Sequence, residues 1–213
     1  MALSAAASAK REERLERRQT QILDAARVCV RAEGFHAASM SRIAAEAGMG
    51  VGHIYQYFDN KEAIMIALSE CDFEEFMLHI TRLGQGATLD LDALIDAFLG
   101  DIMWLLDHDR AALALEVMAE SGRNPKVAEL VLRVDREFRQ AAGKIVETMI
   151  ADLSQNDVDA RVEMLLVMTR ALLIHAGTHP VSDRKILADG FELALRGVLS
   201  SPAPAGSRAA ALR

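Results

Sequence analysis

Apolar residues recur with a helical period along almost the whole chain, and no stretch of any length alternates apolar and polar residues as a strand does. Short breaks that carry glycine, proline or helix-capping residues separate the periodic stretches, as at Gly34, at residues 84–86 and at Asn124-Pro125. We expect a first helix that ends near Gly34. Further helices are expected over about residues 41–47, 51–58, 61–83, 89–107, 110–121, 125–153, 157–176 and 182–199. The predicted fold class is all-α, with about nine helices, in which a three-helix helix-turn-helix head at the N-terminus joins a larger C-terminal helical bundle.

Composition agrees with this pattern, because 51% of the residues are apolar, only 5% are aromatic and there are only 4 prolines. No run approaches the roughly 18 apolar residues that span a bilayer, and MALSAAASAKREERLERR lacks the apolar centre of a signal peptide. We therefore expect a cytoplasmic protein without a membrane partner. The two cysteines, Cys29 and Cys71, exclude a disulfide framework and a four-cysteine zinc site, and we expect both as small core residues.

The formal charge of -7 at first disfavours a nucleic-acid partner, because phosphate binding needs local positive potential. The charge is unevenly distributed, however. Residues 1–62 hold 9 Lys or Arg against 8 Asp or Glu, a net +1, so residues 63–213 hold the remaining 15 against 23, a net -8. The acidity therefore belongs to the C-terminal part of the chain.

The N-terminal segment is basic in its second half, where KREERLERR at residues 10–18 carries five basic and three acidic residues. We expect residues 1–18 to form a basic arm that contacts phosphate, the alternative being an ordinary solvated helix start. Residues 19–60 are expected to form the helix-turn-helix domain and residues 61–200 a ligand-binding and dimerisation domain. Residues 201–213, rich in Pro, Ala and Ser, are expected to be disordered.

Two short helices around Gly48 carry the functional signal, since a glycine in the turn between two short helices is typical of a helix-turn-helix. Apolar positions such as Ile43 and Ile54 can pack these helices together. Small and hydrogen-bonding side chains remain on the outer face of the second helix, and such a face can lie in the major groove of DNA. Gly50 and Gly52 at the start of that helix would let the backbone approach DNA closely.

The stretch from Gly34 to Ile64 resembles the DNA-binding domain of the tetracycline-repressor (TetR) family. The resemblance rests on Gly34-Phe35, Ala38-Ser39-Met40, Ile43-Ala44, Ala47-Gly48-Met49-Gly50, Gly52, Tyr55-Gln56-Tyr57-Phe58 and Lys61-Glu62. It implies an all-helical dimer that binds a double-stranded DNA operator through its head and a small molecule through its body. Gly50 departs from the family pattern, which has serine there, and removes a side-chain cap.

Carried over position by position, the resemblance implies DNA contacts by Ser39, Ser41, Arg42, Val51, Gly52, His53, Tyr55, Gln56, Tyr57 and Lys61. For His53 and Gln56, base contact competes with a solvated helix face. Tyr55 could contact phosphate or mainly pack. Lys61, at the start of the next helix, is expected to hold a flanking phosphate as a point charge.

The C-terminal part is expected to contain the dimer interface and the effector pocket. The last two helices are apolar around much of their circumference, which a four-helix interface with a second copy would use. The expected interface residues are Leu165, Leu172, Leu187, Phe191, Leu195 and Val198. The expected pocket residues are Met103, Trp104, Asp107, His108, Leu115, Glu116, Met118, Phe138, Met164, Met168 and His175, with plain core packing and solvated faces as the alternative.

The leading hypothesis is a repressor that a small, largely apolar effector releases from an inverted-repeat operator; an interior acid would favour a cationic effector. One alternative is a DNA-binding regulator without a small-molecule ligand, which acts as an activator or through a protein partner. Another is an enzyme in the helical body, which no Ser-His-Asp order, phosphate loop or metal cluster supports. His175 and His179 are four residues apart, but Gly177 and Pro180 disfavour a metal site, and we expect neither metal nor cofactor.

Overall fold

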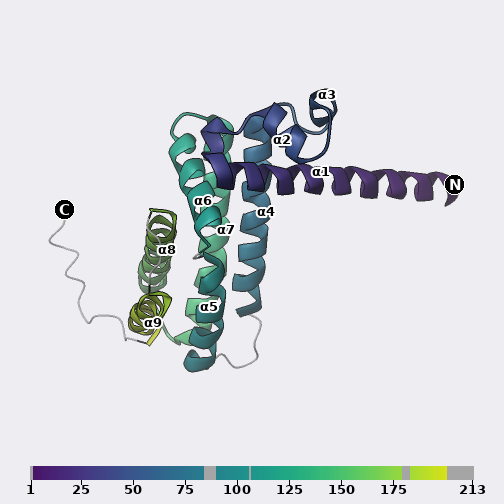
Figure 1. The fold of residues 1–213 in the computed structure, drawn as a ribbon. Helices are drawn as coiled ribbons and strands as arrows, with labels where there is room; N and C mark the ends of the chain where they lie inside the picture. Colours follow the sequence, from purple (N-terminus) through teal and green to yellow (C-terminus); the bar gives the residue numbers. More distant parts are fainter. Residues whose placement is uncertain (1, 84–89, 106, 179–182, 201–213) are drawn as a thin grey trace. The chain divides into compact units, whose positions relative to one another are not determined.

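The computed structural model describes residues 2–83, 90–105, 107–178 and 183–200, and their regular structure is entirely helical. The nine helices of these residues are α1 (Ala2–Ala37), α2 (Met40–Glu46), α3 (Val51–Ile54), α4 (Lys61–Leu83), α5 (Leu91–Leu105), α6 (His108–Ser121), α7 (Pro125–Met149), α8 (Gln155–Thr178) and α9 (Arg184–Ser200) (Figure 1). The predicted all-α fold is confirmed. No described helix is both long enough and apolar enough to cross a bilayer.

Helix capping explains several of the observed bounds. The Asn60 carboxamide oxygen accepts a hydrogen bond from the backbone N–H of Ala63 at 2.8 Å, which sets the start of α4. The Asn124 carboxamide oxygen accepts one from the Lys126 N–H at 3.1 Å, and α7 begins with proline at its first position as expected. The helices begin where the sequence supplies these caps.

The bounds of α1 and α3 are the ones that bear most on the DNA-binding head, and both differ from the sequence expectation. The expected arm is already helical, since α1 begins at Ala2, and Gly34, with φ 76° and ψ 160°, kinks α1 near its end. Regular helix in α3 ends at Ile54 and turns follow to Tyr57, whose N–H bonds the Ile54 carbonyl three residues back. The expected disordered tail, residues 201–213, lies outside the described residues.

Two compact units divide the chain. The head unit comprises residues 1–74 and 112–131, and the body unit comprises residues 75–111 and 132–213. Helices α4, α6 and α7 each contribute residues to both units. The expected functional boundary after residue 60 falls inside the head unit and stays a prediction.

The core of the head unit gathers apolar side chains from α1, α2, α3 and the start of α4. Its buried members are Ile22, Ala25, Ala26, Cys29, Ala38, Ile43, Ala44, Ala47, Ile54, Phe58 and Ile64. The Gln21 carboxamide donates to the Ala47 carbonyl at 2.7 Å and so ties α1 to the end of α2, which lies beside it (Figure 1). These contacts hold α2 and α3 in a defined position on α1.

Asp72 on α4 points inward, where the sequence favoured Cys71. The Arg27 guanidinium of α1 binds both carboxylate oxygens of Asp72, at 2.6 and 3.0 Å, and both side chains are largely buried. A paired charge can therefore occupy the inward position four residues after Leu68, and the expectation that Cys71 is a core residue is wrong: Cys71 is exposed. Cys29 is buried as expected.

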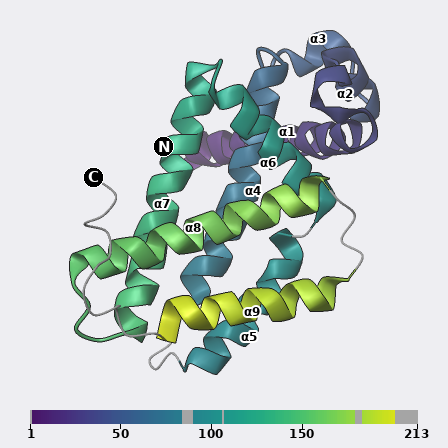
Figure 2. The same ribbon diagram turned by 90° about the vertical axis from the view of Figure 1, so that its left-hand side faces the viewer.

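In the body unit, α8 and α9 lie side by side and both contact α5 (Figure 2). Their buried side chains form one core with residues of α4, α5, α6 and α7. Two pairs of stacked rings strengthen it, Phe76 with Phe138 and Phe98 with Phe191, at centroid distances of 6.1 and 5.7 Å. Asp135 of α7 accepts from Arg139 and from Arg170 of α8, each at 2.7 Å, which fixes α8 against α7.

Candidate DNA-binding surface

The turn between α2 and α3 depends on Gly48. The Met49 N–H bonds the Ala44 carbonyl at 2.8 Å and the Gly48 N–H bonds the Ala45 carbonyl at 3.1 Å, a pairing that ends many helices. Gly48 has φ +64° at this point, a conformation that costs glycine little and other residues more. The sequence expectation for Gly48 is confirmed, and this turn sets the angle at which α3 leaves α2.

Helix α3 buries one side and exposes the other. Ile54 is completely buried in the head core, whereas Val51, Gly52, Tyr55 and Gln56 are exposed. Because Tyr55 is half exposed, packing occupies only part of its ring. The outer face therefore carries small side chains at Val51 and Gly52 and hydrogen-bonding side chains at Tyr55 and Gln56, as the sequence indicated, and such a face can lie in a groove.

His53 and Tyr57 form a pair at the edge of this face. Their rings meet edge to face with centroids 5.5 Å apart, and the Tyr57 hydroxyl lies 3.5 Å from Nε2 of His53. Both side chains are partly buried. The contact orients the imidazole without hiding it.

Open space surrounds the two glycines at the start of α3. Gly50 has φ -71°, so it needs no special backbone freedom, and it caps α3 without any side-chain hydrogen bond. A Cβ placed on Gly50 or Gly52 would meet no atom within 4 Å. The protein's own packing therefore does not require glycine at either position.

Exposed hydroxyl and guanidinium groups lie at the start of α2. The Ser39 hydroxyl accepts from the Arg42 N–H at 3.2 Å as the helix cap, and the hydroxyls of Ser39 and Ser41 are 2.9 Å apart. The exposed Arg42 guanidinium binds Glu33 at 3.0 Å and Glu46 at 3.4 Å. The hydrogen bond from Arg42 to Glu33 raises the pKa of Arg42 above its usual value. Sequence reasoning missed Glu33, whose carboxylate competes with phosphate for this arginine.

All ten expected DNA contacts belong to one stretch of the head unit, from Ser39 to Lys61. Seven of them are exposed, and His53, Tyr57 and Lys61 are partly buried. Lys61 begins α4 immediately after the Asn60 cap. None of the ten is buried, so each could be reached by a partner.

The expected pocket residues belong to both units, and the pocket stays a prediction. Leu115, Glu116 and Met118 belong to the head unit, whereas the other eight belong to the body unit. The side chains of Met103 and Trp104 lie outside the described residues. Met164 and His175 are exposed, and the exposed His108 bonds the Ala176 carbonyl through Nδ1 at 2.8 Å.

The body unit does contain a small apolar cavity, of about 30 Å³, at the centre of its core. Of the expected pocket residues only Phe138 lines it. Its other lining residues are Ile80, Leu94, Ile95, Phe98, Ala142, Ile145, Leu165, Thr169, Phe191, Leu195 and Leu199. Helical periodicity alone could have grouped these residues by face, but it could not have shown which faces meet.

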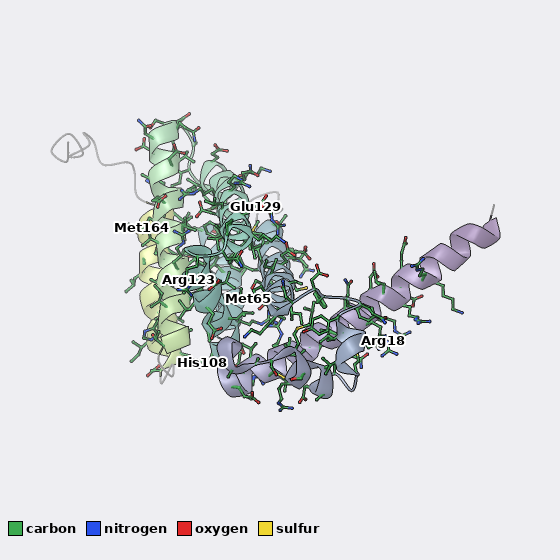
Figure 3. All side chains as sticks on the ribbon, turned by 90° about the horizontal axis from the view of Figure 1, so that it is seen from above. Arg18, Met65, His108, Arg123, Glu129 and Met164 are labelled. Atoms are coloured by element: carbon green, nitrogen blue, oxygen red, sulfur yellow. The ribbon has the colours of Figure 1, made fainter. Side chains whose placement is uncertain are left out.

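The six expected interface residues all belong to the core of the body unit. Leu165, Leu172, Phe191 and Leu195 are buried, and Leu187 and Val198 pack against them. Other large apolar side chains are exposed on the same two helices, namely Met164 (labelled in Figure 3), Val167 and Ile174 on α8 and Ile186 and Leu193 on α9. A side chain buried in its own chain has little surface left for a partner, so the apolar area that a second copy could cover is this exposed set.

Comparison with known proteins agrees with the geometry of the head. Residues 22–68 match the model of the bacterial regulatory proteins of the tetR family. The chain is 25% identical over 193 residues to the HTH-type transcriptional regulator UidR of Escherichia coli K12, covering 86% of this chain and 93% of that protein. It is 35% identical over 88 residues, 41% of this chain and 47% of the relative, to the HTH-type transcriptional repressor Rv1474c of Mycobacterium tuberculosis H37Rv.

A solved structure extends the likeness to the whole fold. Salmonella enterica GusR superimposes with a TM-score of 0.68 at 26% identity, over 86% of this chain and 96% of that one. The match therefore extends well beyond the helix-turn-helix, over most of the chain. With its helix-turn-helix head and its helical body, the chain belongs to the tetR family of bacterial regulatory proteins and is a DNA-binding transcriptional regulator.

Proposed function

We propose that this regulator is a repressor that binds an inverted-repeat operator as a homodimer and leaves it when a small, uncharged, apolar effector enters the body unit. The observation that carries the DNA-binding part is the outer face of α3. Gly52 is exposed there and its surroundings are open, so the free volume is available to DNA. One relative that shares part of this sequence is a transcriptional repressor by name, which supports repression over activation.

Two kinds of contact are expected on this face. His53 and Gln56 carry hydrogen-bonding groups that can read base edges, and the contact with Tyr57 holds the His53 ring in one orientation. Ser41, Arg42 and Lys61 flank α3 and carry groups that bind phosphate oxygens. The first kind sets sequence preference and the second sets position and salt dependence.

Replacing Lys61 or His53 by alanine separates these two roles. We expect Lys61→Ala to weaken binding to all duplexes alike and to lower the slope of log Kd against log salt by about 0.9 for each phosphate that Lys61 neutralises. We expect His53→Ala to leave that slope unchanged and to relax the base preference at one position of each half-site. Selection from a random duplex pool, followed by salt titration of the selected duplex, measures both. An unchanged slope for Lys61→Ala would refute the phosphate contact.

The exposed apolar side chains of α8 and α9 support the homodimer. On α8, Met164, Val167 and Ile174 recur at intervals of three and seven residues and so share one face. On α9, Ile186 and Leu193 are seven residues apart, and both are more than two thirds exposed. Since α8 and α9 are neighbours, a second copy could cover both faces at once in a four-helix arrangement.

The cavity of the body unit supports an uncharged effector. None of the described residues that line it is charged, and Thr169, the one polar side chain among them, donates its hydroxyl to the Leu165 carbonyl at 2.9 Å. A cation would find no carboxylate in this lining to compensate its lost hydration. The cavity is also too small for a drug-sized molecule, so an effector must displace lining side chains of α4, α5, α7, α8 or α9. By displacing these side chains, the bound effector could shift the regulator from a conformation that binds the operator to one that does not.

Filling the cavity should abolish the effector response without affecting operator binding. We expect Ala142→Leu to bind the operator like wild type and to need at least tenfold more effector for release, because the added methyl groups occupy the site. A mobility-shift assay with a panel of uncharged apolar compounds and matched quaternary ammonium compounds measures the response. Ala119→Leu on the exposed side of α6 is the control. Release by the cationic compounds alone would contradict the proposed effector class.

A further inference from the structure

Residues 10–18 of α1 carry their basic and acidic side chains on two different sides of the helix. Residues 10–18 are helical, and each of their side chains is exposed to solvent. At 100° per residue, the five basic positions fall within about 120° of the helix circumference, and the three acidic positions fall within about 100° on the opposite side. We name them the basic stripe, Lys10, Arg11, Arg14, Arg17 and Arg18, and the acidic stripe, Glu12, Glu13 and Glu16.

The basic stripe continues the side of α1 that packs on the helix-turn-helix. Arg11, Arg18 and the buried Ala25 follow one another at intervals of seven residues, about two helical turns. The acidic stripe follows another side of α1, the side of Arg27, whose guanidinium binds Asp72 of α4. Glu16 is on this side because it precedes Arg27 by 11 residues, about three helical turns.

A surface groove between α1 and the end of α2 includes one residue of each stripe. Its lining includes Arg17, Gln21 and Ala47, the last residue before the Gly48 turn. Three carboxylates, those of Glu16, Asp24 and Glu46, line it as well. The basic stripe therefore reaches the helix-turn-helix, and one carboxylate of the acidic stripe lies near that end.

The part of α1 that bears the stripes extends beyond α2 and α3 in both views (Figures 1 and 3). Arg18, labelled in Figure 3, donates to the Gln21 carboxamide at 2.8 Å, which holds this arginine near the helix-turn-helix end of the stripe. The stripe therefore begins at the helix-turn-helix and leads away from it.

Such a stripe is unfavourable for an isolated helix. Lys10, Arg14 and Arg18 are spaced four residues apart, and like charges at this spacing destabilise an exposed helix. A polyanion along the stripe would reverse this effect. From Lys10 to Arg18 the helix rises about 12 Å, which corresponds to about three to four base pairs of duplex at 3.4 Å each.

We propose that the basic stripe of α1 is a second DNA-binding surface, which lies along the phosphate backbone outside the bases that α3 reads. It lengthens the bound site by about three to four base pairs at each end and adds affinity without sequence preference. The proposal rests on the DNA binding proposed above for the head.

The test compares two triple variants that differ only in the side of α1 they change. Arg11→Gln, Arg14→Gln and Arg18→Gln neutralise most of the basic stripe, and Glu12→Gln, Glu13→Gln and Glu16→Gln neutralise the acidic stripe. Glutamine retains good helix propensity, so circular dichroism should show equal helix content in both. Kd is measured against salt concentration for the selected operator, once with long flanks and once trimmed to the bases that α3 protects.

We expect the basic-stripe variant to bind the long duplex at least tenfold more weakly than wild type, with a salt slope lower by about 0.9 for each phosphate that the three arginines neutralise. Trimming the flanks should weaken wild type to the same extent and leave the basic-stripe variant unchanged. The acidic-stripe variant should keep the wild-type slope and should bind at least as tightly.

Wild-type affinity and slope in the basic-stripe variant, or equal weakening by both triple variants, would overturn the proposal. Failure of α3 to select any duplex is a separate outcome that affects the proposed function instead. In that case the stripe is tested by non-specific binding to a long duplex, whose salt slope must still fall in the basic-stripe variant.

Discussion

Replacing Gly52 by leucine is expected to weaken operator binding by about a hundredfold or more while the free protein stays folded. The exposed position has open space around it, so a leucine side chain meets no atom of the protein at its Cβ. The side chain would instead occupy the volume that DNA fills in the complex. Each half-site then binds about 1–3 kcal/mol more weakly, the usual magnitude for a disrupted base contact, and the dimer contains two half-sites.

The stability of the free protein should change in the opposite direction. Leucine is favoured over glycine inside a helix by up to about 1 kcal/mol, so thermal unfolding should occur at the same temperature or higher. Fluorescence anisotropy of a labelled operator and a thermal melt of the same sample measure the two effects. Wild-type operator affinity in Gly52→Leu would contradict the placement of DNA against α3.

Gly48→Leu is the matched control, because this glycine is also exposed and also has open space around it. Its φ of +64° strains any side chain, so this variant should lose about 1 kcal/mol or more of unfolding free energy. The two glycines are only four residues apart and lie in the same short motif. Gly52→Leu should weaken DNA binding without loss of unfolding free energy, whereas Gly48→Leu should lower the unfolding free energy.

Replacing Leu193 by arginine is expected to convert the dimer to a monomer. Leu193 on α9 is 73% exposed in the single chain, so the free subunit tolerates a charge there. In the proposed interface the same charge would lose its hydration against the apolar faces of α8 and α9. Sedimentation analysis should show the monomer at concentrations where wild type is a dimer.

Operator affinity should fall with the loss of the dimer. Two linked heads gain about a hundredfold or more over one head from effective concentration, and the monomer lacks this gain. Leu78→Arg is the matched control, since Leu78 is an exposed leucine of the body unit on α4, a helix that contributes no residue to the proposed interface. A dimeric Leu193→Arg, or dissociation of Leu78→Arg, would show that the interface lies elsewhere.

Local signals in the sequence predicted most of the helices and the DNA-binding head. Asn60 and Asn124 carry capping side chains, and Gly48 supplies a conformation that a tight helix end requires, so each acts through its nearest neighbours. The same locality explains why the outer face of α3 was predictable. Ile54 is the largest apolar side chain of α3, and the orientation that buries it leaves Val51 and Gly52 exposed.

The body unit was less predictable because α8 and α9 are apolar around much of their circumference. Periodicity shows that Leu165 and Leu172 share one face and that Met164 and Val167 share another, but both faces are apolar. Packing against α5 and α7 buries the first face and exposes the second. The cavity was also unpredictable from periodicity, because its lining combines residues from five helices.

The sequence by itself determined the all-helical fold, the helix-turn-helix and the residues that face outward on α3, because short-range hydrogen bonds and the helical period decide these features. Only the tertiary structure decided that Asp72 rather than Cys71 points inward, since that choice depends on Arg27, a residue 45 positions earlier in the chain. It also decided which apolar faces of α8 and α9 are buried. Those outcomes depend on contacts between distant segments, and no local pattern encodes them.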